Sequence, residues 1–199
     1  KDISTGKGLV ETAIAYLKAN GCVSVVGPVD FTTWFTYRFQ EASEGESPFS
    51  WEPVTPSHYI PIFEACGFQE IERYHSVGFA AKNDGDPIPG TPLLKPAFDN
   101  AVKTGFTIKP LDMALSELPE LYKLSMVGFT ESFLYEPITY DVFKSIYSMA
   151  LTRFDFSPSR LILDSKKQAI GFLFAFIDRG YIVIKSIAIA PEFRALKLS

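Results

Sequence analysis

The chain has 199 residues, of which 47% are hydrophobic and 15% aromatic, enough apolar material for one domain or two closely packed halves. A net charge of −4 and a pI near 5.3, with acids scattered among the bases, exclude a typical nucleic-acid-binding protein. Apolar runs stay short of the roughly 18 residues that a membrane-spanning helix needs. We therefore expect a soluble globular protein that uses neither nucleic acid nor membrane.

The cysteines and histidines are few. Cys22 and Cys66 lie far apart between apolar neighbours, which predicts buried free thiols in a reducing cytoplasm, with a disulfide between them as the alternative. His58 and His75 have no third ligand at metal spacing, so no metal site is expected. The chain begins without a methionine and ends at Ser199, and we expect it to be part of something longer or processed.

The first predicted element is a helix over residues 4–19, with Ser4 or Thr5 as its cap and Asn20-Gly21 as its end. Gly6-Lys7-Gly8 would form a turn opening this helix. Such a turn is either a phosphate cradle or the start of an ordinary capped surface helix. A short buried strand is expected next, over residues 22–29, ended by Gly27-Pro28.

Aromatic residues are dense between Asp30 and Trp51, around an acidic loop. This density in a loop-like segment is typical of either a lid over a ligand pocket or a satellite core under a long loop. Asp30, Arg38 and Glu52 are the charged residues here best placed to face a bound molecule.

A short helix over residues 57–68 and a strand over 69–79 follow. Residues 81–104 then carry four prolines and two glycines, with a short helix at 98–103. A break of this kind separates structural units. We expect residues 1–81 and 105–199 to be two halves joined by a linker at 82–104, and the halves to pack as one unit.

The pattern restarts after the linker. We expect a strand at 106–111, helices at 118–129 and 140–151, strands at 160–164 and 169–177, and a last strand over Tyr181–Ala190. The last strand is an unbroken apolar and β-branched run closed by Pro191, which predicts a central strand buried on both faces.

The end of that strand reads Ala188-Ile189-Ala190-Pro191-Glu192-Phe193-Arg194, and it resembles the fourth strand of the GNAT superfamily of N-acetyltransferases. In this family a glycine-rich loop and a helix follow, and their backbone N–H groups hold the pyrophosphate of acetyl-coenzyme A. Arg194 matches the family's loop, whereas Lys197 and Ser199 stand where the family has glycines. The helix ending at Gly67-Phe68 resembles a second family block. In that block the family has a tyrosine that often acts as the acid, and Phe63 stands at its position here.

The resemblance implies an α/β (α+β) fold: a mixed, mostly antiparallel central sheet flanked by helices. The order is permuted, because residues 105–199 resemble the family's first half and residues 1–81 its second half. The chain would be either the middle of a tandem protein or a permuted single domain. Pairing of the halves with each other, in a homodimer, or with flanking GNAT half-domains would cover the exposed strand edges.

The implied reaction is transfer of an acetyl group from acetyl-coenzyme A to the amine of a small molecule or peptide. The family pattern would place coenzyme contacts at Thr5, Gly6, Lys7, Gly8, Ile187, Ala188, Ile189, Ala190 and Arg194. Tyr59 would be the acid that protonates the departing thiolate, and Glu52 or Glu192 the base. The alternatives are a catalytically silent GNAT-like module that binds a ligand, peptide or domain, and an unrelated small-molecule-binding domain with its pocket at residues 31–51.

Overall fold

The computed structural model describes residues 3–41, 47–79, 91–111 and 116–194. The chain divides into two compact units, Lys1–Ser76 and Val77–Ser199. The predicted linker falls partly on residues 80–90, which lie outside the described residues, and the packing of the two halves as one unit stays a prediction. None of the helices in the described ranges is long and apolar enough to cross a membrane.

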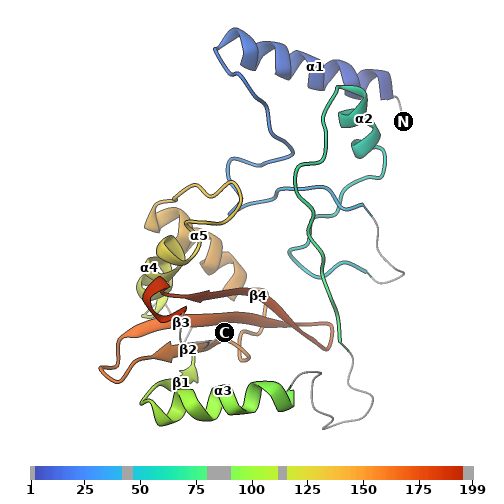
Figure 1. Ribbon diagram of the computed structural model, residues 1–199. Coiled ribbons are helices and arrows are strands. Elements are labelled where there is room, and N and C mark those ends of the chain that lie inside the picture. The colour runs from blue at the N-terminus through green and yellow to red at the C-terminus, as the bar shows by residue number, and fades with distance from the viewer. Residues whose placement is uncertain (1–2, 42–46, 80–90, 112–115, 195–199) are drawn as a thin grey trace. The chain divides into compact units, whose positions relative to one another are not determined.

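The first unit contains two helices that pack side by side, α1 (Ile3–Ala19) and α2 (Tyr59–Ala65) (Figure 1). Both were predicted, α2 with wider bounds. The strands expected at 22–29 and 69–79 are wrong: these described segments hold no strand, only a bridge between Val29 and Tyr37. Val23 is fully exposed and Cys22 is exposed, so this segment is not buried either. Both cysteines are free thiols, as predicted, but the predicted burial is wrong, because Cys22 is exposed and Cys66 is only partly buried.

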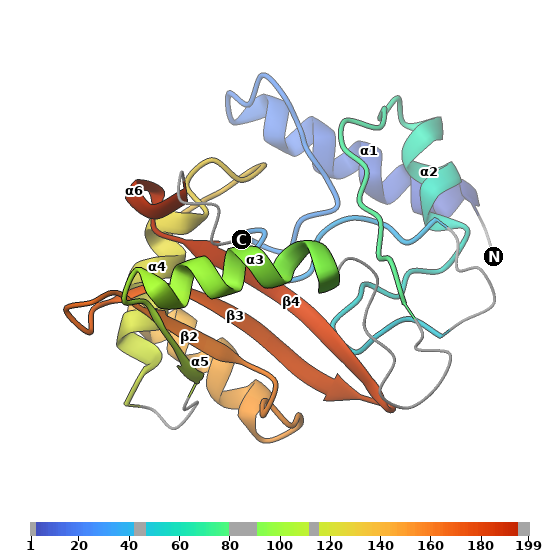
Figure 2. The same ribbon diagram turned by 60° about the horizontal axis from the view of Figure 1, so that its bottom comes forward.

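The second unit is a four-stranded antiparallel sheet with helices, and the mixed α+β class is confirmed. Its elements are α3 (Thr91–Lys103), β1 (Thr107–Pro110), α4 (Leu118–Gly128), α5 (Tyr140–Leu151), β2 (Arg160–Leu163), β3 (Ala169–Asp178), β4 (Tyr181–Ile189) and α6 (Pro191–Arg194). Helices α4 and α5 cover one face of the sheet, and α3 lies on the other (Figures 1 and 2). Helix α3 is longer than the predicted 98–103 and includes Pro96.

The core of this unit lies between β3 and the two helices above it. Phe172, Phe174 and Phe176 alternate along β3, so their side chains share one face, and all three are fully buried. Phe174 packs on Tyr147 of α5 with ring centroids 4.9 Å apart, and Phe172 on Phe129 at the end of α4 at 6.4 Å. Every second residue of β3 and one face of each helix are therefore buried together in a single apolar layer.

The position of β4 corrects one prediction. The strand order is β1-β2-β3-β4, so among the described strands β4 has a neighbour on one side only. Ile182 and Ile184 are 64% and 59% exposed, and burial begins at Ala188. β4 is therefore an edge strand, and β3 is the strand buried on both faces.

Candidate functional site

At the end of β4, the backbone N–H and C=O groups of successive residues point alternately toward β3 and away from it. The N–H of Ala190 donates to the carbonyl of Ile170 on β3, at 2.8 Å. In an antiparallel pair successive residues direct their N–H and C=O groups alternately toward and away from the partner strand. Ala188 and Ala190 therefore face β3, whereas Ile187 and Ile189 direct their N–H groups to the open edge. Of the four positions predicted here, two can offer donors to a ligand beside the sheet.

Arg194 turns back from α6 onto β4 and α4. Its Nη2 donates to the carbonyl of Gly128 at 2.8 Å, its Nε to the carbonyl of Ile189 at 3.2 Å, and its Nη1 to Glu131 Oε2 at 3.1 Å. Gly128 ends α4, where carbonyl groups lack helical partners and a cation is favourable. Arg194 thus joins the C-terminus of α4 to the end of β4, and its predicted phosphate contact stays a prediction.

The helix and the strand joined by Arg194 approach closely because both carry small residues. A Cβ added at Gly128 would lie 2.9 Å from the Cβ of Ala188, well inside ordinary contact. Gly171 on β3 is similarly restricted, since a Cβ there would meet the carbonyl oxygen of Ala188 at 2.9 Å. The backbone at the end of β4 is therefore held from two sides.

The predicted phosphate cradle has a different local structure. Thr5, Gly6, Lys7 and Gly8 all lie inside α1, so the segment forms an ordinary helix, which was one of the two alternatives, and not a glycine turn. A Cβ at Gly6 would lie 2.5 Å from Cδ1 of Ile62, which places Gly6 at the contact between α1 and α2. Lys7 pairs with Glu11 one turn later, at 3.5 Å. These residues support helix packing, and their coenzyme contact remains untested.

Gly8 offers a direct test of that helical role. It is exposed in mid-helix, and a Cβ there would meet nothing within 4 Å. We expect Gly8→Ala to raise the free energy of unfolding of the first unit by about 0.8 kcal/mol, because alanine loses less backbone entropy in a helix. Trp34 and Trp51, the chain's two tryptophans, both lie in this unit, so fluorescence-detected urea unfolding measures it. A lower midpoint would mean that Gly8 is not a helical residue in solution.

Glu52, the predicted base, is held in an aromatic and charged cluster. Its Oε2 accepts from Arg38 Nη2 at 3.3 Å, and both side chains are about three-quarters buried. The Arg38 guanidinium lies over the rings of Tyr37 and Tyr74, 4.8 and 4.9 Å from their centroids. Burial raises the pKa of Tyr74, and the neighbouring Tyr37 raises it further. Arg38 adopts the left-handed backbone conformation, with φ of 64°, to reach this position.

Tyr59, the predicted acid, begins α2 and is 42% exposed. Its ring contacts Phe39 edge-on at 6.4 Å, and Phe39 also packs on Phe63 at 4.8 Å. Phe63 in turn contacts Phe68. These contacts favour the satellite-core interpretation for this part of the aromatic segment, although Phe31 is 90% exposed.

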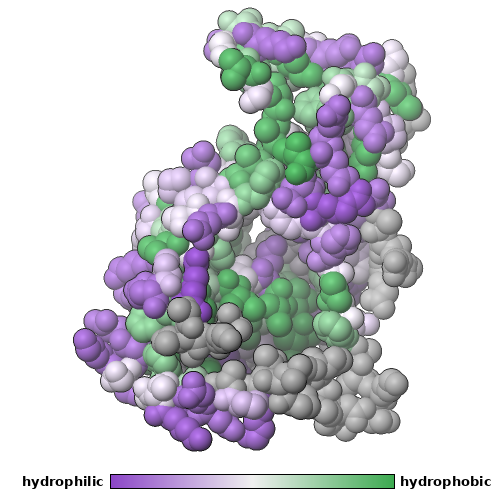
Figure 3. Space-filling view, viewed as in Figure 1, coloured by the Kyte–Doolittle hydropathy of each residue, from purple (hydrophilic) through white to green (hydrophobic). Residues whose placement is uncertain are grey.

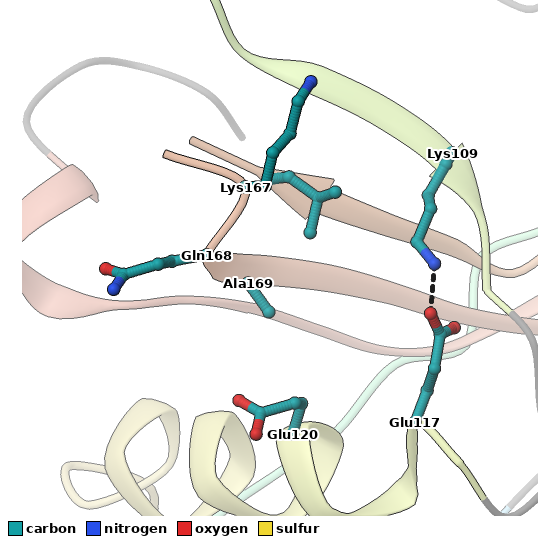
Figure 4. Close-up of a pocket in the computed structure, with 7 residues that line it drawn as sticks. Lys109, Glu117, Glu120, Lys167, Gln168 and Ala169 are labelled. Atoms are coloured by element: carbon teal, nitrogen blue, oxygen red, sulfur yellow. Dashed lines mark hydrogen bonds and ion pairs between the residues drawn. The ribbon is translucent and has the colours of Figure 1, made fainter. Parts of the chain in front are cut away.

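A polar cavity of about 540 Å³ lies at the far side of the sheet from β4. Figure 4 shows Lys109 of β1 reaching Glu117 in an ion pair, with Glu120 extending from α4. Lys167, in the β2–β3 turn, donates to Thr107 at 3.1 Å. The charged side chains that line the cavity are largely paired within the protein, so the cavity suits a small polar molecule. Sequence reasoning missed it because its residues come from separate elements.

The predicted site residues are divided between the two units. Thr5 to Gly8, Glu52 and Tyr59 belong to the first unit, and Ile187 to Ala190 and Arg194 to the second. In the described residues no cluster of His, Cys, Asp or Glu could hold a metal ion. Comparison of the chain with protein-family models, with curated proteins and with solved structures gives no match.

Proposed function

We propose that this chain is a GNAT-type module that binds acetyl-coenzyme A at the end of β4 and transfers its acetyl group to an amine. The observation that carries the proposal is the order of elements in the second unit: one strand, two helices and three strands, in an antiparallel sheet ordered β1-β2-β3-β4. This is the order expected from the resemblance. The strand that ends in the family-like Ala190-Pro191-Glu192-Phe193-Arg194 is β4, and its end is held rigidly against α4.

The chemistry would use the open edge of β4. The acceptor nitrogen attacks the thioester carbonyl carbon, the C–N bond forms, and the C–S bond breaks to release a thiolate. The outward N–H groups of Ile187 and Ile189 would stabilise the oxyanion. Glu192, the alternative base, lies on α6 in the same unit and would take the proton from the amine, and water would protonate the thiolate. Arg194 would meet the pyrophosphate.

The second candidate is a GNAT-like module that binds a ligand or partner without catalysis. The contacts of Arg194 favour it, because its guanidinium already donates to two backbone carbonyls and a carboxylate. Phe63, at the family's acid position, packs on Phe39 and Phe68 and carries no hydroxyl. Lys197 and Ser199, at the glycine positions, lie outside the described residues.

Calorimetric titration of the 199-residue chain with acetyl-coenzyme A, and with coenzyme A as comparison, tests coenzyme binding. We expect micromolar affinity for both, because the pyrophosphate and pantetheine are common to them. An acceptor screen would follow. Failure to bind at millimolar coenzyme would refute the proposal for this chain and leave the silent module.

A substitution at Ile187 separates catalysis from binding. Proline at this half-exposed edge position removes the outward N–H and keeps the hydrogen bonds to β3. We expect Ile187→Pro to lower the acetylation rate about 100-fold while leaving coenzyme affinity within a few-fold, whereas Ile187→Val should keep both. Equal rates for the two variants would exclude this N–H as an oxyanion donor.

A further inference from the structure

The polar cavity lies toward the edge of the sheet opposite β4, between the β2–β3 turn and the start of α4. On its sheet side Leu163 at the end of β2 and Ala169 at the start of β3 are cross-strand partners, and both are half-buried. The volume of about 540 Å³ falls in the range of about 300–1,000 Å³ that is typical of small-molecule sites. The cavity therefore has room for a small ligand whose apolar part rests on these two side chains.

Opposite charges line the two sides of this cavity. Lys109 of β1 and Lys167 of the β2–β3 turn belong to the sheet side. Glu117 and Glu120 come from the start of α4 (Figure 4). Figure 3 shows hydrophilic surface, in purple, over the β2–β3 turn. The two positive and two negative side chains balance, so a ligand with a net charge would leave one charge uncompensated, whereas a zwitterion matches both sides.

Lys109 is held in place at the cavity by its ion pair with Glu117. The side chain of Glu117 is 17% exposed and that of Lys109 is 38% exposed, so the pair is partly withdrawn from solvent. An ammonium group has three N–H donors, and Lys109 directs one of them to Glu117. A second donor of the same group can bind a ligand carboxylate at a low entropic cost, because the side chain is already ordered.

Glu120 supplies the negative charge for the other end of such a ligand. Its Oε1 accepts from Lys123 Nζ at 2.7 Å on the surface of α4. The two oxygens of a carboxylate offer about four acceptor sites, so Glu120 can accept from a ligand ammonium group as well. Lys123 is 68% exposed, and an exposed ion pair of this kind contributes little, so it does not hold Glu120 away from a ligand.

We propose that this cavity binds a free α-amino acid with an apolar side chain. The carboxylate of the amino acid accepts from Lys109, with Lys167 as the second cation, and its ammonium group donates to Glu120. Its side chain packs on Leu163 and Ala169. An α-amino acid suits the site because its two charged groups are bonded to one carbon atom and lie close together, as the charges of Lys109 and its partner do.

Titration of the isotope-labelled full chain with L-leucine, followed by nuclear magnetic resonance, tests the choice of ligand. We expect saturable shifts of the amide signals of Leu163, Gln168 and Ala169. L-Leucinamide lacks the carboxylate and N-acetyl-L-leucine lacks the ammonium group, so each should bind about 10-fold more weakly than L-leucine through the loss of one charge-assisted contact. The absence of saturable shifts at millimolar L-leucine, or equal affinity for L-leucine and either analogue, would overturn the proposal.

Two substitutions in α4 test the role of Glu120. Glu120→Gln keeps the shape of the side chain and removes its charge, so it should weaken L-leucine binding about 10-fold and leave N-acetyl-L-leucine, which has no ammonium group, unchanged. Lys123→Gln is the matched control, because it breaks the same surface ion pair without altering the lining of the cavity, and its affinity should stay within about two-fold of the wild type. Equal losses in the two variants would contradict the contact with Glu120.

The amino-acid site goes beyond the proposed acetyl transfer and does not depend on it, because the cavity and β4 lie toward opposite edges of the sheet. Glu120→Gln should therefore leave the affinity for acetyl-coenzyme A unchanged. L-Leucine binding by a chain that does not bind the coenzyme would support this proposal and remove the enzymatic one. Coenzyme binding by a chain that does not bind L-leucine would do the reverse.

Discussion

Ser159→Ala is expected to lower the free energy of unfolding of the second unit by about 3 kcal/mol. Strand β2 begins at Arg160, opposite Leu173, so between Leu173 and the bridge of Ile177 to Asp155 the backbone of β3 has no ladder partner on that side. Ser159 Oγ replaces it, donating to the carbonyl of Ala175 at 2.7 Å and accepting from the N–H of Ala175 at 3.0 Å. Both residues are fully buried. Alanine would leave two buried backbone groups unpaired, each costing about 1–3 kcal/mol.

The chain provides a matched control for this substitution. Ser125 of α4 is equally buried, but its Oγ has no hydrogen-bond partner among the described residues. Ser125→Ala should therefore be neutral or stabilise the unit by about 1 kcal/mol, since it removes a desolvated hydroxyl and no bond. Urea unfolding followed by far-UV circular dichroism measures both variants. Similar losses from the two would mean that side-chain volume, and not the Ser159 bridge, matters here.

The local elements of the second unit could be predicted from the sequence because their signals are local. The bounds of α5 agree with the expectation, and Thr139 caps it by accepting from the N–H of Val142 at 3.4 Å. The apolar spacing in α4 was equally clear. The predicted helix at 98–103 was shorter than α3 because its surroundings, with four prolines and two glycines, were interpreted as a linker, yet the helix begins at Thr91 and continues through Pro96.

Pairing could not be predicted in the same way. The run from Tyr181 to Ile189 is apolar enough for a central strand, but composition does not tell how many neighbours a strand has, and β4 lies at an edge. Val23, Val25 and Val26 have strong strand propensity, yet their segment forms no strand in the described residues. Strand propensity is a measure of packing against cross-strand neighbours, so it loses its meaning where the partner is not given.

The candidate site shows the same limit. Glu52 was singled out as a charged residue within an aromatic segment, but its contact with Arg38 depends on a left-handed backbone conformation at Arg38 that no sequence signal marks. Arg194 was chosen for a phosphate. Its observed partners Gly128 and Glu131 lie more than 60 residues away in sequence and become neighbours only after α4 packs on β4.

Arg194→Ala should lower the free energy of unfolding of the second unit by about 2 kcal/mol in the absence of any ligand. The substitution removes charge-assisted hydrogen bonds to the carbonyls of Gly128 and Ile189, which are worth more than neutral ones, and its partial exposure reduces the sum. Glu131→Gln is the matched control, because Glu131 is 82% exposed and its ion pair should contribute less than about 0.5 kcal/mol. Far-UV circular dichroism during urea unfolding measures both.

The same pair of variants decides what Arg194 does in coenzyme binding. If Arg194 only links α4 to β4, its substitution should lower the stability of the protein. The coenzyme affinity should then fall only in proportion to the unfolded fraction. If Arg194 also contacts the pyrophosphate, the coenzyme affinity of Arg194→Ala should fall by more than the unfolded fraction explains. Arg194→Lys keeps the charge with fewer donors and should recover part of that affinity. If Arg194→Ala left stability unchanged, the contacts to Gly128 and Ile189 would be incidental, and a loss of coenzyme affinity could then be attributed to the phosphate alone.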